Sequence, residues 1–66
     1  MNDEIRAALI LKYSAEVAMA KANIQVYLRH PAGIGEHSDI IGAVDEQVEK
    51  AATAEEKLNF ITILKY

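Results

Sequence analysis

The segment Arg29-His-Pro-Ala-Gly-Ile-Gly-Glu-His-Ser-Asp39 divides the 66-residue chain into two halves of nearly equal length. Pro31 disfavours a helical conformation at His30, and the two glycines that follow favour turns. The segment therefore predicts a loop over residues 30–37. Outside it the chain has no other proline and a single further glycine, so each half is free to form one long helix.

The first half has the signals of a helix start. Asn2 can cap a helix, and Asp3 and Glu4 complement the positive end of its dipole. No proline or glycine interrupts the chain before the loop. We therefore expect a helix over about residues 3–29.

The second half begins with a similar signal. Ser38 supplies a capping oxygen, Asp39 follows in the first turn, and the segment beyond is rich in Ala, Glu and Lys. We expect a helix over about residues 39–64. Thr53-Ala-Glu-Glu56 offers a capping box that would restart the helix, but one continuous helix is the favoured interpretation.

Two helices of about 40 Å joined by a short loop favour an all-α, antiparallel two-helix hairpin, which forms a single domain over residues 1–66. Apolar residues of the first helix alternate by three and four, as in the seam of a coiled coil. These residues are Ile10, Tyr13, Val17, Ala20, Ile24 and Tyr27. The expected partners in the second helix are Ile40, Ile41, Val44, Val48, Ala51, Leu58 and Ile61, and Glu55 interrupts their line.

The first helix carries more apolar surface than one partner can cover. A second apolar stripe lies roughly opposite the seam and comprises Ala8, Leu11, Ala15, Ala18, Met19, Ala22 and Val26. Two apolar faces imply two packing partners, so we expect a dimer or a higher helical bundle with this helix at its centre. The alternative is that the alanines are there only as good helix formers.

The C-terminal segment, residues 58–66, is the most hydrophobic part of the chain. Its β-branched and aromatic residues also suit a strand, but no breaker precedes it, so helix is the favoured interpretation. Phe60, Ile63 and Leu64 make this end apolar nearly all round. We expect them to join the oligomer interface, which would then include Leu11, Ala15, Ala18, Met19, Ala22, Val26, Phe60, Ile63 and Leu64.

The loop region holds the only cluster of residues suited to chemistry. His30, Glu36, His37 and Asp39 are ligand types for zinc, but they lack the helical i,i+4 spacing of a convincing metal motif. We therefore predict no metal, no cofactor and no catalytic residue. The loop is either a contact site or only a turn, and the candidate contact residues are Gly33, Ile34, Gly35, Glu36 and His37.

The charge distribution and composition of the chain limit the kinds of partner that it is expected to bind. Residues 1–33 carry four basic and three acidic side chains, and residues 34–66 carry three basic and seven acidic ones. The basic residues are scattered rather than clustered, so nucleic acid is not an expected partner. There is no cysteine, no basic leader and no apolar run near the ~20 residues that a membrane span requires. We therefore expect a soluble protein that does not bind membranes and is found in the cytoplasm or in a virion.

The stretch from Lys21 to Ile40, Lys-Ala-Asn-Ile-Gln-Val-Tyr-Leu-Arg-His-Pro-Ala-Gly-Ile-Gly-Glu-His-Ser-Asp-Ile, resembles short, uncharacterised proteins of tailed phages, particularly those that infect marine cyanobacteria. The resemblance covers about 20 of the 66 residues and implies no activity. It implies a viral setting, in which a small helical oligomer is more often a virion component, an assembly factor or a host-directed binding protein than an enzyme.

These observations together predict a non-enzymatic structural or assembly protein whose partner is a second copy of itself. The alternative is a regulatory binding module that docks a helix of a different protein, from the host or the virus, on the exposed apolar stripe. An enzyme is disfavoured because so small a hairpin offers no deep pocket.

Overall fold

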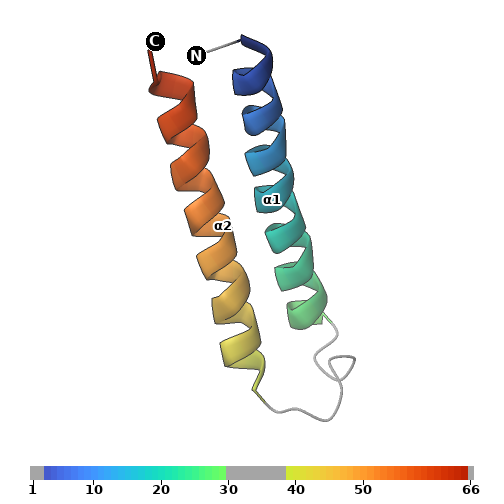
Figure 1. Cartoon of the computed structure of the whole chain (residues 1–66). Helices are drawn as coiled ribbons and strands as arrows, with labels where there is room; N and C mark the ends of the chain where they lie inside the picture. Colours follow the sequence, from blue (N-terminus) through green and yellow to red (C-terminus); the bar gives the residue numbers. More distant parts are fainter. Residues whose placement is uncertain (1–2, 30–38, 66) are drawn as a thin grey trace.

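The computed structural model describes residues 3–29 and 39–65, and these form two α-helices. Helix α1 spans Asp3–Arg29 and helix α2 spans Ile40–Ile63. They lie side by side and antiparallel, with both chain ends at the same end of the hairpin (Figure 1). The molecule measures 49 × 15 × 13 Å, so it is only one helix pair thick. The predicted hairpin is confirmed.

The bounds of both helices agree closely with the prediction. Helix α1 begins and ends where it was expected, and α2 is one residue shorter than expected at each end. Helix α2 continues through Thr53 without a restart. It remains helical through Ile63, so the helical interpretation of the C-terminal segment is confirmed, and Leu64 then turns to an extended conformation.

The residue that caps α2 differs from the one expected. The Asp39 carboxylate accepts a hydrogen bond from the Gly42 N–H at 2.9 Å, and the Asp39 carbonyl accepts one from Ala43 N–H at 3.2 Å. Asp39 is therefore the N-cap, and the prediction that Ser38 caps the helix with Asp39 in its first turn is wrong. The longer Asp side chain reaches the third N–H of the helix from this position. Ser38 lies outside the described residues.

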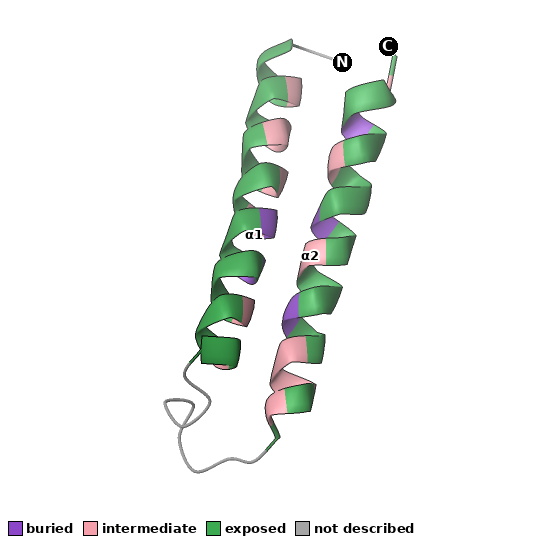
Figure 2. Ribbon diagram, turned by 180° about the vertical axis from the view of Figure 1, so that it is seen from behind, coloured by how far each residue is buried: buried purple, intermediate pink, exposed green. Residues whose placement is uncertain are grey.

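The core lies along the line where the two helices meet. Val17 and Ala20 of α1 and Ala54 and Ile61 of α2 are buried, together with Gln47. In Figure 2 the buried and half-buried positions occupy the facing sides of the helices, while the outer sides are exposed. The other predicted seam residues of α1, Ile10, Tyr13, Ile24 and Tyr27, are half-buried, so the seam of α1 is as predicted.

The seam of α2 differs from the predicted one. Its inward positions also alternate by three and four, and they are Ile40, Val44, Gln47, Ala51, Ala54, Leu58 and Ile61. The predicted seam residues Ile41 and Val48 are 86% and 48% exposed, and Glu55 is also exposed. Each lies one residue, or about 100°, from the inward line. The prediction is therefore wrong at these positions, and Ala54 fills the place at which Glu55 was thought to interrupt the seam.

A polar contact joins the helices in the half nearer the loop. Asn23 Nδ2 donates to Gln47 Oε1 at 3.1 Å. Gln47 is only 7% exposed, so this bond satisfies an amide oxygen that would otherwise be buried beside apolar side chains. Because the bond forms only when the two residues lie at the same level, it favours one register of α2 along α1.

Candidate interaction surface

The second apolar stripe lies on the face of α1 that points away from α2. Helical geometry places it there: Ala15 lies two residues before buried Val17, and Ala22 lies two residues after buried Ala20, and each step of two residues is about 200° around the helix. All seven residues of the stripe are exposed. The three largest, Leu11, Met19 and Val26, have exposed fractions of 72%, 59% and 53%.

The stripe is long and nearly continuous. Ile5 extends it by one turn towards the N-terminus, and it is also more than half exposed. Lys12 borders the stripe, one turn from both Ala8 and Ala15. Its Nζ lies 6.0 Å from the centroid of the Tyr13 ring, within the range of a cation–π contact. The stripe is thus an apolar surface that α2 does not cover.

The second predicted group of interface residues lies on the other helix. Phe60 and Ile63 are exposed on α2, and Leu64 is half-buried at its C-terminal end. Ile63 follows buried Ile61 by two residues, so it faces away from α1. Because the second apolar stripe faces away from α2, the hairpin does not bring the two groups together. Within one hairpin the predicted interface residues therefore lie on two different faces.

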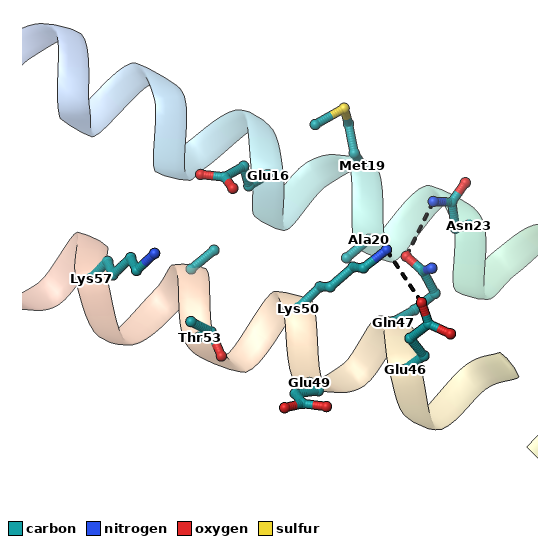
Figure 3. A pocket seen from close by; sticks show the side chains of 11 residues that line it. Glu16, Met19, Ala20, Asn23, Glu46, Gln47, Glu49, Lys50, Thr53 and Lys57 are labelled. Atoms are coloured by element: carbon teal, nitrogen blue, oxygen red, sulfur yellow. Dashed lines mark hydrogen bonds and ion pairs between the residues drawn. The ribbon is translucent and has the colours of Figure 1, made fainter. Parts of the chain in front are cut away.

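A shallow groove of about 520 Å³ runs along one side of the hairpin (Figure 3). Glu16, Asn23 and Lys57 are among the residues that line it, and the Asn23–Gln47 bond crosses it. Glu16 Oε1 is buried there with no hydrogen-bond partner.

Charged side chains at the edge of the groove form an ordinary surface pair. Lys50 Nζ lies 3.6 Å from Glu46 Oε1, with both side chains more than half exposed. The two residues are four apart on α2, and such exposed pairs contribute about 0.2–0.5 kcal/mol. The Glu46–Lys50 pair stabilises α2 itself and not the contact between the helices, since both residues belong to α2.

The candidate loop contacts Gly33, Ile34, Gly35, Glu36 and His37 lie outside the described residues, as does His30. Within residues 3–29 and 39–65, no group of three or more His, Asp or Glu side chains is placed to hold a metal ion. Neither α1 nor α2 has a stretch that is long and apolar enough to span a membrane.

Sequence reasoning found the exposed stripe but missed three residues that shape the hairpin: Arg6, Gln47 and Ala54. The spacing of three and four carried a signal for Gln47 and Ala54, because both fall on the same line as Ile40 and Ile61. Arg6 continues the spacing of the α1 seam, since it lies four residues before Ile10, the first seam residue.

The chain was compared with known protein families, with curated proteins and with solved structures, and none of the three comparisons finds a match.

Proposed function

We propose that this protein is a non-enzymatic structural or assembly protein that acts by homo-oligomeric helix packing through the outer face of α1. The observation that carries the proposal is the exposed second apolar stripe, with Leu11, Met19 and Val26 each more than half exposed. Contiguous apolar surface of this kind on a small protein is typical of a site of association. Its alanines allow another helix to approach closely.

The area of the molecule supports association. Its accessible surface is 5143 Å² for a mass of 7.3 kDa. A compact monomer of that mass would expose roughly 4,200 Å², so the excess is on the order of 1,000 Å². A stable interface of ordinary size covers about 800 Å² on each partner. An elongated helix pair thus exposes more surface than a compact monomer of its mass, and packing against a second copy would cover part of it.

The core of a single hairpin is small, which also favours association. Only four apolar residues, Val17, Ala20, Ala54 and Ile61, are buried among the described residues, and two of them are alanines. Chains of this length usually need further stabilisation, and this one has no cysteine to form a disulfide. Packing against a second copy would supply the missing apolar burial.

The proposed setting is viral, in line with the resemblance of residues 21–40 to short proteins of tailed phages. A small self-associating hairpin fits a virion component or an assembly factor there. If the protein is a virion component, purified phage particles would contain it. If it is an assembly factor, it would be found only with assembly intermediates.

Sedimentation velocity of the purified chain at tens of micromolar tests the proposal. We expect a dimer or a larger species for the parent and a shift towards monomer for Leu11→Glu and Met19→Glu, since each places a charge on the stripe. Ile41→Glu is the control, because Ile41 is even more exposed than Leu11 and Met19 but lies on α2. It should sediment as the parent does.

Circular dichroism of the same samples separates loss of association from loss of folding. The proposal is wrong if the parent is a folded monomer at that concentration, or if all three variants weaken association equally. A folded monomer would instead favour the binding module that docks a helix of a different protein.

A further inference from the structure

We propose that two copies of the chain dock α1 against α1 in antiparallel orientation, about a two-fold axis that passes between Ala15 and Ala18. This inference rests on the proposed function and adds the identity and direction of the helix that covers the stripe. Three features lead to it: the sizes of the stripe residues on α1, the charges at the two ends of the stripe, and the carboxylates on the outer face of α2.

The sizes of the stripe residues alternate in a way that suits antiparallel packing. When two copies of α1 run in opposite directions about this axis, residues whose numbers sum to 33 or 34 lie at the same level. Leu11 then meets Ala22, Met19 meets Ala15, and Val26 meets Ala8. Each large side chain thus faces a small one, which is the arrangement that fills space between closely packed helices.

Parallel packing would give the opposite result. Leu11 of one copy would lie beside Leu11 of the other, and Met19 beside Met19, while each alanine would face an alanine. The large pairs would hold the helices apart where the small pairs leave gaps. Good packing would then be lost along the whole stripe.

The charges at the two ends of the stripe give the same orientation. Glu4 lies seven residues before Leu11 and Arg29 lies seven residues after Ala22, so both continue lines of the stripe. Both residues are exposed. Their numbers sum to 33, so antiparallel docking brings Glu4 of one copy to Arg29 of the other at each end. Parallel docking would instead bring like charges together.

The outer face of α2 is a poor alternative partner for the stripe. Asp45, Glu49 and Glu56 are exposed carboxylates on that face. An apolar stripe packed over them would remove charged groups from water without providing partners, which is costly. Between Ala8 and Val26 the outer face of α1 carries no such carboxylates, so a second copy of α1 is the better partner for the stripe.

The absence of cysteine from the parent allows a direct test of orientation. Two single-cysteine variants, Glu4→Cys and Arg29→Cys, are prepared, and one of them carries an affinity tag. Each variant by itself, and a mixture of the two, is treated with a short bis-maleimide. We expect the mixture to give a cross-linked heterodimer in at least several-fold greater yield than either variant gives alone. Glu49→Cys, on the outer face of α2, is the control and should stay uncross-linked.

The possible outcomes separate this inference from the proposed function. Cross-linking of each variant with itself but not with the other means parallel docking, which overturns the inference and leaves the proposed function standing. A dimer that cross-links in neither experiment, or no better than Glu49→Cys, also overturns it. A monomer in sedimentation of the parent overturns both.

Discussion

The guanidinium of Arg6 in α1 donates a hydrogen bond to the backbone carbonyl of Ile61 in α2 at 2.8 Å. The same group also reaches the carbonyls of Thr62 at 3.4 Å and of Leu64. The last carbonyls of a helix have no partners within the helix, and a cation near them also complements the helix dipole. One side chain of α1 thus caps the C-terminus of α2.

We expect Arg6→Gln to lower the free energy of unfolding by about 1.5–3 kcal/mol, because hydrogen bonds that involve a charged group contribute about that much and the hydrogen bond to the Ile61 carbonyl is part-buried. Urea denaturation at one fixed protein concentration measures this. Hydrogen exchange should also become faster at the Leu64 amide, which donates to the Phe60 carbonyl in the last turn. Lys21→Gln removes the same charge from an exposed position of α1 and should change stability by less than about 0.5 kcal/mol. Equal losses in both variants would show that net charge, and not the cap, is responsible.

Most of the fold follows from the sequence because its signals are local. The proline and glycines of residues 30–37 end one helix, and nothing interrupts the residues on either side. The seam of α1 was predictable for the same reason, because large apolar residues such as Ile10 and Ile24 mark it.

The seam of α2 was harder to predict because it depends on its partner. Hydrophobicity alone selects Ile41 and Val48, but the structure buries Gln47 and Ala54 instead. Asn23 on α1 supplies the donor that makes a buried Gln47 tolerable, and a position where two helices approach closely accepts only a small side chain. Neither condition can be read from the residues of α2 alone.

The cap of α2 predicts an unusual response to a common stabilising change. Replacing a glycine in a helix by alanine ordinarily stabilises it by about 1 kcal/mol. A Cβ on Gly42, however, would lie 2.8 Å from Cγ of Asp39, so the capping carboxylate would have to move. We expect Gly42→Ala to give no gain, or a loss, in the free energy of unfolding.

The same change should stabilise the protein once the cap has been removed. Asp39→Ala alone should cost about 1 kcal/mol, the usual value for an N-cap. In that background Gly42→Ala meets no carboxylate and should recover about 1 kcal/mol from helix propensity. A double-mutant cycle by thermal or urea unfolding measures the difference. If Gly42→Ala has the same effect with and without Asp39, the two residues are not coupled as the structure indicates.

The buried alanine of α2 provides the sharpest test of which face of that helix packs on α1. Ala54 is 3% exposed and lines the groove of Figure 3 together with Ala20 of α1, which is 2% exposed. Ala54→Leu must force the helices apart, and overpacking of this kind costs about 1–3 kcal/mol. Ala52→Leu is the matched control, because Ala52 is exposed and lies about 200° away around the same helix. Its free energy of unfolding should stay within about 0.5 kcal/mol of the parent value. If Ala54→Leu were tolerated and Ala52→Leu were not, α2 would have to be rotated from the orientation described, and the seam through Gln47 and Ala54 would be wrong.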